Sequence, residues 1–316
     1  MKHALIVFAA LVFMSSCTAS GQASNNEQYN RDENGSVSFQ VFYDGLSPYG
    51  TWIDYPGYGY AWIPNAGPDF HPYLSGGHWV YTDAGWTWVS DYEWGWATFH
   101  YGSWNFDATY GWMWLPGYQW APAWVTWGSY DGYYGWAPAG FDFSIGIGFP
   151  NYRPPINYWC YAPQNAITSI NINRNIITDK VTINNIHNHV NIINNNSDKT
   201  NVYNRGPALA EVEHATGKKI TPVKIASAER AGKDQTGNGT VNIYRPKIDA
   251  TKNGAAKPAK INTPETLHAK APTNSSEQID NSKKREVNSS PFAKPATKPQ
   301  KKKNKEQVTL SSNKTI

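Results

Sequence analysis

Tryptophan spacing governs the architecture of this chain more than any other property of its sequence. Fourteen of the fifteen tryptophans lie between residues 52 and 136. They recur in four units with a Gly-x-Trp start or a close equivalent, a turn-rich spacer and a second Trp after Gly: YGTWIDYPGYGYAWIP, GHWVYTDAGWTWVS, YGSWNFDATYGWMWLP and VTWGSYDGYYGWAP. The leading tryptophans stand 27, 25 and 23 residues apart. Such a period indicates one supersecondary unit per repeat.

Each unit is expected to form a β-hairpin. Alternation such as Trp86-Thr-Trp88 places alternate indoles on one face of an extended strand. The spacers contain the Asp and Gly that short hairpin loops favour, and frequent Gly and Pro exclude long helices. We therefore predict an all-β fold of about four Trp-rich hairpins that form one sheet or a small barrel within residues 37–142.

The N-terminal residues MKHALIVFAALVFMSSC indicate export. A short basic start is followed by an apolar run and small residues before Cys17. The run is shorter than the roughly 20 apolar residues that a membrane span needs. Met-Ser-Ser-Cys resembles a bacterial lipobox, so we expect a lipid anchor on Cys17 and a place in the cell envelope. Simple secretion is the alternative.

Charge is divided unevenly along the chain, which has a net charge of +4. Between Arg31 and Arg153 there are eleven Asp and Glu residues and no Lys or Arg, whereas 21 basic and 10 acidic residues follow from residue 206. The acidic part disfavours a nucleic-acid partner. The basic part has two interpretations, contact with anionic envelope polymer or lipid headgroups, and a solubilising tail.

The segments after the hairpins differ in composition. An Asn and Ile tract has period-2 apolar positions that suit short strands, which could also self-associate through their edges. A later stretch predicts a short helix over 207–216, stopped by Gly217, and extended pieces. The predicted division is 1–17 signal peptide, 18–36 linker, 37–142 repeat domain, 143–163 Pro-rich connector, 164–204 Asn/Ile tract, 205–248 small appendage and 249–316 disordered basic tail.

Several motifs carry a resemblance to a known family: Tyr43-Asp-Gly-Leu-Ser-Pro-Tyr-Gly-Thr-Trp52, Trp94-Gly-Trp-Ala97 and Gly135-Trp-Ala-Pro138. Over about residues 39–142 the chain resembles an uncharacterised, Trp/Tyr/Gly-rich family of exported bacterial proteins, catalogued as a domain of unknown function. Later segments look similar to those of Bacteroidetes lipoprotein members. The resemblance implies no reaction or ligand. The chain departs from the family pattern at Glu93, Thr98, Phe99 and Ser103, the last of which replaces a basic residue.

Carboxylates supply the enzymatic alternative, a cell-wall glycan hydrolase. Such an enzyme needs two carboxylates about 5–10 Å apart. Of the candidates Asp83, Asp91, Glu93, Asp107 and Asp131, the first, fourth and fifth occupy equivalent turn positions in successive repeats. Asp is favoured there because it hydrogen-bonds the local backbone. We interpret these three as turn formers and expect no enzymatic activity.

Histidine and cysteine predict neither a metal site nor a cofactor. Alternation places His187 and His189 on one strand face, but two ligands do not make a zinc site. His100 is interpreted as a core residue that hydrogen-bonds between strands. Cys160 is either a reactive thiol or, as we favour, a small half-buried hydrophobe.

Aromatic platforms remain the best candidate for binding. With few Leu, Ile or Val in the repeats, most indoles must be core, and a few are expected to be exposed. We choose Trp94, Trp96, Trp120 and Trp124 as candidate ligand-binding aromatics. The leading hypothesis is a non-enzymatic envelope lipoprotein that acts as an interaction or structural module for glycan or protein. A self-assembling surface scaffold is the alternative, and the sequence leaves the oligomeric state open.

Overall fold

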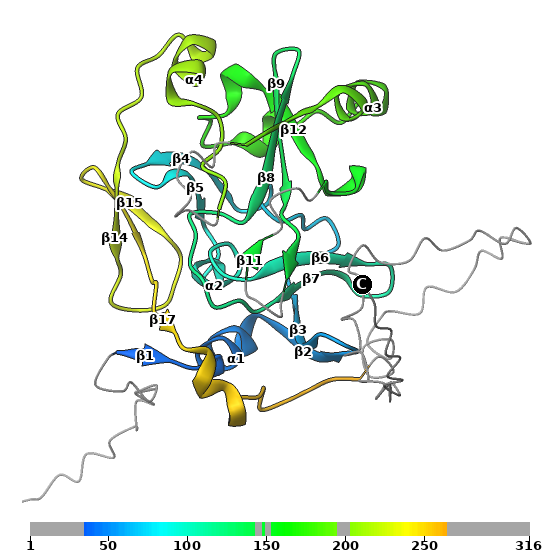
Figure 1. Cartoon of the computed structure of the whole chain (residues 1–316), viewed down its shortest axis with the longest axis vertical. Helices are drawn as coiled ribbons and strands as arrows, with labels where there is room; N and C mark the ends of the chain where they lie inside the picture. Colours follow the sequence, from blue (N-terminus) through cyan, green and yellow to red (C-terminus); the bar gives the residue numbers. More distant parts are fainter. Residues whose placement is uncertain (1–34, 143–146, 149–152, 195–202, 264–316) are drawn as a thin grey trace, which may run out of the picture.

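A computed structural model describes residues 35–142, 147–148, 153–194 and 203–263. It contains four antiparallel hairpins, one for each tryptophan unit (Figure 1). The predicted all-β class and the four hairpins are therefore confirmed. The hairpin strands are β2 (Gly50–Tyr55) with β3 (Gly59–Pro64), β4 (Gly77–Thr82) with β5 (Gly85–Ser90), β6 (Ser103–Asp107) with β7 (Gly111–Leu115), and β8 (Val125–Tyr130) with β9 (Tyr133–Pro138).

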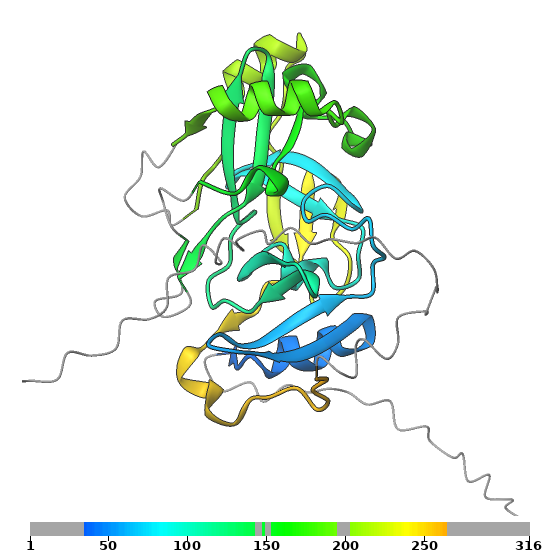
Figure 2. The ribbon, with the colours of Figure 1, turned by 90° about the vertical axis from the view of Figure 1, so that its right-hand side faces the viewer.

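The hairpins are shared among three sheets. One sheet has the order β2-β3-β7-β6, a second contains β4 and β5 alone, and a third has the order β12-β9-β8-β13, with β12 at Cys160–Pro163 and β13 at Asn191–Ile193. None of the described sheets closes into a barrel. In Figure 2 the sheet of β8 and β9 lies at the top and the hairpin of β2 and β3 near the bottom, so the hairpins are arranged in tiers around a shared core.

Every hairpin places two tryptophans opposite each other on neighbouring strands. All eight side chains are 2% exposed or less, and cross-strand aromatic pairs are an effective unit of sheet stabilisation. The repeat in the sequence is therefore a repeated core element. The pairs are Trp52 with Trp62, Trp79 with Trp88, Trp104 with Trp114, and Trp127 with Trp136.

The glycine two residues before the leading Trp is required by a close approach. A Cβ atom on Gly77 would lie 2.5 Å from the carbonyl oxygen of Val89 and 2.7 Å from Cε2 of Trp88. The same atom on Gly50 would lie 2.4 Å from Cε2 of Trp62. In both hairpins the second indole lies over the glycine of the first strand, which explains the Gly-x-Trp start of the repeat.

The remaining elements are short and cover or connect the hairpins. The α-helices are α1 (Gln40–Leu46), α2 (Gly95–Thr98), α3 (Lys180–His189) and α4 (Leu209–Thr216). The 3-10 helices are η1 (Ser47–Tyr49), η2 (Ile156–Tyr158), η3 (Gln164–Ala166), η4 (Ile172–Asn175) and η5 (Ala250–Ala255). The other strands are β1 (Ser36–Val37), β10 (Phe141–Asp142), β11 (Ile147–Gly148), β14 (Lys224–Ser227), β15 (Gln235–Gly237), β16 (Thr240–Ile243) and β17 (Lys247–Ile248).

In the described part of the Asn and Ile tract, residues 164–194 form mostly helical turns, so the strands predicted there are wrong except at β13. Helix α3 begins after Asp179, whose carboxylate accepts a hydrogen bond of 2.7 Å from the Thr182 amide. This is an N-cap contact, which satisfies an amide that has no partner within the helix. His187 and His189 lie in the last turn of this helix and do not share a strand face.

The C-terminal strap, which we define as residues 203–263, packs along the hairpins and is not a separate appendage. The Trp86 indole donates a hydrogen bond of 3.0 Å to the Pro207 carbonyl. The Tyr101 hydroxyl donates one of 2.6 Å to the Pro246 carbonyl. The strap also contributes fully buried side chains to the same core cluster as the tryptophans. It therefore completes the core of the hairpins.

Order in the strap extends beyond the point predicted from sequence. Helix α4 ends at Gly217 with φ +68°, as predicted.

The predicted disorder from residue 249 is wrong for residues 249–263. The Asn253 side chain accepts a hydrogen bond of 2.8 Å from the Phe39 amide. The Asn262 amide donates one of 2.9 Å to the carbonyl of Trp52. Residues 264–316 and residues 1–34, with Cys17, lie outside the described part.

Candidate functional site

Three of the four candidate tryptophans are buried, so the exposure on which their choice rested is contradicted. Trp94, Trp96 and Trp124 are 4%, 1% and 3% exposed. Trp96 packs between Phe42 of α1 (centroids 5.7 Å apart) and Tyr244 of the strap (5.0 Å). Segments from both ends of the described chain thus cover indoles that the repeat alone leaves open. These rings cannot offer a flat face to a ligand.

Trp120, the fourth candidate, is half-buried, and two side chains lie against its ring. The His100 ring stacks on it with centroids 5.6 Å apart and planes inclined by 14°. The guanidinium carbon of Arg245 lies 5.5 Å from the ring centroid, in a cation–π arrangement. Trp120 therefore joins the strap to the hairpins, and these contacts compete with the stacking of a sugar on its ring.

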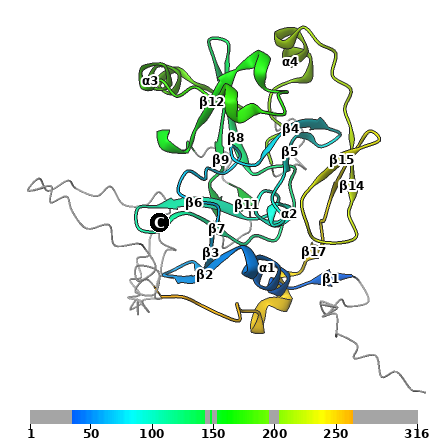
Figure 3. The same cartoon turned by 180° about the vertical axis from the view of Figure 1, so that it is seen from behind.

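Three tyrosine side chains reach the surface together at adjacent hairpin tips. We define the tyrosine cluster as Tyr55 and Tyr58 at the tip of hairpin β2–β3 and Tyr110 at the tip of β6–β7. All three are partly exposed, and the two tips lie side by side at one edge of the molecule (Figures 1 and 3). The rings of Tyr55 and Tyr58 stack with centroids 5.6 Å apart, and Tyr110 meets Tyr55 edge-on at 6.3 Å.

Asp107 fixes the orientation of this cluster. One carboxylate oxygen accepts a hydrogen bond of 3.1 Å from the Tyr55 hydroxyl. The other accepts from the amides of Thr109 (2.7 Å) and Tyr110 (3.2 Å). Burial, and then the Asp107 carboxylate, raise the pKa of Tyr55 well above its ordinary value, so the phenol remains a donor. Asp107 is a turn former, as predicted, and it also ties the two hairpin tips together.

Sequence reasoning overlooked the tyrosines because it searched for exposed indoles. A usable signal was present: Tyr55-Pro-Gly-Tyr58 and Tyr110-Gly111 place tyrosine beside turn glycines. A side chain at a hairpin tip has no neighbouring strand on one side, so it is covered less completely than one in the middle of a strand. The tip positions were therefore better candidates than the inter-unit tryptophans.

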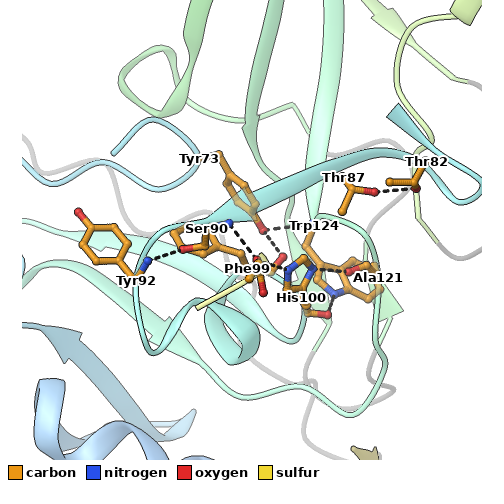
Figure 4. Close-up of polar contacts among 10 residues, drawn as sticks. Tyr73, Thr82, Thr87, Ser90, Tyr92, Phe99, His100, Ala121 and Trp124 are labelled. Atoms are coloured by element: carbon orange, nitrogen blue, oxygen red, sulfur yellow. Dashed lines mark hydrogen bonds and ion pairs between the residues drawn. The ribbon is translucent and has the colours of Figure 1, made fainter. Parts of the chain in front are cut away.

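A second polar cluster lies entirely inside the molecule. The His100 Nε2 atom lies 3.3 Å from the Asp234 carboxylate, and both side chains are 0% exposed. His100 Nδ1 donates to the Ala121 carbonyl at 3.0 Å, because a carbonyl can only accept. Figure 4 shows the imidazole between Ala121 and the strand that carries Ser90. His100 is thus the buried, hydrogen-bonded core residue that the sequence predicted, but its partners lie in loops and not in strands.

Although this cluster contains Ser, His and Asp, its contacts differ from those of a nucleophilic triad. The Ser90 amide, and not its hydroxyl, donates to Asp234 at 2.9 Å. The Ser90 hydroxyl oxygen accepts a hydrogen bond from the Tyr92 amide at 3.2 Å. A triad needs the serine hydroxyl on the imidazole. The cluster joins β5 and the turn after α2 to the strap, which is a structural role.

Cys160 is also a core residue. It is 3% exposed, and burial raises the pKa of its thiol, which disfavours the thiolate. Its sulfur lies 3.5 Å from Nδ1 of His71, whose pKa is lowered, chiefly by burial. The interpretation as a small hydrophobe is favoured over a reactive thiol. In the described part of the chain, no group of three or more His, Cys, Asp or Glu side chains could hold a metal ion.

Comparison with known proteins identifies a domain of unknown role. Residues 43–143 match the profile of a family described as "Family of unknown function (DUF6600)". The match spans the four hairpins, which agrees with the family resemblance of their motifs. No curated protein and no solved structure is significantly similar to the chain.

Proposed function

We propose that this protein is a non-catalytic, lipid-anchored module of the bacterial cell envelope, and that its tyrosine cluster binds glycan. The observation that carries the proposal is a cluster of three partly exposed tyrosine rings, held by an ordered carboxylate, at two adjacent hairpin tips. Aromatic rings stack on the apolar faces of sugars, and phenol hydroxyls hydrogen-bond sugar hydroxyls. No basic residue lies between residues 31 and 153, which favours a neutral partner over an anionic one at this site.

A binding role is favoured over a hydrolytic one by the state of Asp107. Each oxygen of its carboxylate already accepts at least one hydrogen bond from the cluster or its turn. A general acid or a nucleophile has to present its carboxyl group to the substrate. Asp107 instead holds tyrosines in place, which suits a preorganised binding surface.

The proposed location in the cell envelope rests on the N-terminal sequence and on the resemblance to exported bacterial lipoproteins. No helix among the described residues is long and apolar enough to cross a membrane. In this proposal, a lipid on Cys17 attaches the chain to the membrane. Replacement by Cys17→Ser should prevent lipid labelling and release the protein from the membrane fraction, whereas unchanged fractionation would refute the anchor.

Glycan binding is tested on the full chain with purified peptidoglycan and a glycan array. Tyr58→Ala and Tyr110→Ala each remove one ring of the cluster and should weaken binding by about threefold to tenfold, since an aromatic contact contributes roughly 0.5–1.5 kcal/mol. Tyr49→Ala is the matched control, because Tyr49 is 37% exposed on η1 and lies outside the cluster. Equal binding by all three variants and the native chain would contradict the proposal.

A further inference from the structure

One edge of the molecule combines exposed lysines with the start of the described chain. We define the basic edge as Lys247, Lys257 and Lys260, all exposed and all in the last part of the strap. Strand β1 pairs with β17 there, with Ser36 opposite Lys247. Figure 2 shows this part of the strap along the bottom of the molecule, under α1. The basic edge and the entry of the chain from its N-terminal linker therefore lie together.

Two acidic groups near this edge, Asp249 and Asp44, are engaged within the protein. Asp249 accepts hydrogen bonds from the Thr251 amide (2.9 Å) and hydroxyl (2.7 Å). Asp44 of α1 accepts one of 2.8 Å from the Gln40 side chain. Lys252 donates to the Ser36 carbonyl at 3.2 Å, which adds a further cation at the point where β1 begins. The edge is thus a site of net positive charge, whereas the four hairpins, within residues 50–138, contain no Lys or Arg.

A lipid on Cys17 would hold this edge close to the bilayer. Only residues 18–35 separate the anchor from β1. Eighteen residues reach at most about 60 Å even when fully extended. The end of the molecule that carries β1 is therefore the end nearest to the headgroups, and the cations on it are placed where a negative surface potential acts.

We propose that the basic edge binds the anionic headgroups of the membrane that holds the lipid anchor, and so orients the hairpins away from the bilayer. This inference rests on the proposed anchor at Cys17, although the edge itself does not require the lipid in order to bind vesicles. An acyl chain combined with a basic patch gives more stable attachment than one chain alone. The acidic hairpin body is repelled by the same surface, which reinforces the orientation.

The test uses the full mature chain without lipid, so that its outcome does not depend on processing at Cys17. Binding is measured by co-sedimentation with vesicles of phosphatidylcholine plus phosphatidylglycerol and with vesicles of phosphatidylcholine alone. The edge variant is Lys247→Gln, Lys257→Gln and Lys260→Gln together. The control variant is Lys218→Gln, Lys224→Gln and Lys233→Gln, which removes three exposed lysines from the rest of the strap. The two variants have the same net charge and the same C-terminal sequence.

The native chain should bind the anionic vesicles and leave the neutral ones unbound. Each lysine that reaches the headgroups contributes about a fivefold gain in binding, so the edge variant should bind about 20- to 100-fold more weakly. The control variant should stay within about threefold of the native chain. Equal weakening of both variants would show that only bulk charge matters and would overturn the proposal, as would native binding that does not require the anionic lipid. Loss of membrane attachment by Cys17→Ser is a separate result, so failure of the anchor and failure of the edge are distinguishable.

Discussion

Substitution of Gly77 by alanine should destabilise the fold, because the second indole of the hairpin occupies the space that a side chain would need. The new Cβ atom would lie 2.5 Å from the Val89 carbonyl oxygen and 2.7 Å from two carbons of the Trp88 ring. The first is backbone of the paired strand. The second belongs to a ring that is 0% exposed and meets Trp79 edge-on at 5.2 Å. Neither the carbonyl group nor the ring can move away without disturbing the core.

The magnitude follows from these contacts. Overpacking of a well-packed core costs about 1–3 kcal/mol. The loss of backbone freedom in the unfolded chain offsets roughly 0.4–1 kcal/mol of this when Gly becomes Ala. The free energy of unfolding should therefore fall by about 1–2 kcal/mol, which corresponds to a Tm lower by roughly 2–8 °C in a domain of this size.

The assay is thermal and chemical denaturation followed by near-ultraviolet circular dichroism, which reports the packing of the tryptophans. Gly237→Ala is the control, because no atom lies within 4 Å of the Cβ position on Gly237 and its φ is not positive. The control should be as stable as the native chain or slightly more stable. If Gly77→Ala matched Gly237→Ala, the close-approach explanation of the Gly-x-Trp motif would be refuted.

Three further predictions concern the core. Asp234→Ala should lower the free energy of unfolding by about 3–5 kcal/mol, because it removes the carboxylate that contacts the buried His100 Nε2 and accepts from the Ser90 amide. A denaturation midpoint equal to that of the native chain would contradict this. Trp86→Phe removes the indole hydrogen bond to Pro207, so it should lower the free energy of unfolding by about 0.5–1.5 kcal/mol and increase amide hydrogen exchange in the strap. Unchanged exchange would argue against packing of the strap on the hairpins. Burial raises the pKa of Tyr73 and Tyr101 above the usual 10.0, so the stability that these phenols contribute is fully present below about pH 10 and is lost as the pH rises further; normal titration of all tyrosines in the folded protein would count against it.

The hairpins could be predicted from the sequence because their determinants are local. Alternating tryptophans set the strand faces, and turn residues set the tips. At the tip of β8–β9, Asp131 and Gly132 both have positive φ, +45° and +77°, as a two-residue loop of the Asp-Gly type requires. The distribution of the hairpins among three sheets was not predictable in this way, because it depends on contacts between distant units.

The segment that forms helix α3 contains apolar residues at both a strand spacing and a helical spacing. The strand interpretation used the period-2 positions Val181 and Ile183, yet Val181 is 76% exposed. The buried positions Ile186 and Val190, with half-buried Ile183, follow a helical spacing of three and four. The Asp179 cap was the local feature that favoured a helix.

Burial of the candidate tryptophans could not be derived from the repeat itself. The side chains that cover Trp96 and Trp120 are Phe42, Tyr244 and Arg245, which come from segments before and far after the hairpins. A sequence pattern gives the face on which an indole lies, but not which distant segment packs against that face.

Hydroxyl-radical footprinting of the full chain, alone and bound to peptidoglycan, tests the central claim that tryptophan builds the core while tyrosine meets the ligand. The account predicts that Tyr55, Tyr58 and Tyr110 react in the unbound protein and are protected when it binds. It also predicts that the paired tryptophans of the hairpins, each 2% exposed or less, are nearly unreactive in both states. Protection of tryptophan-containing peptides with no change at the three tyrosines would contradict it.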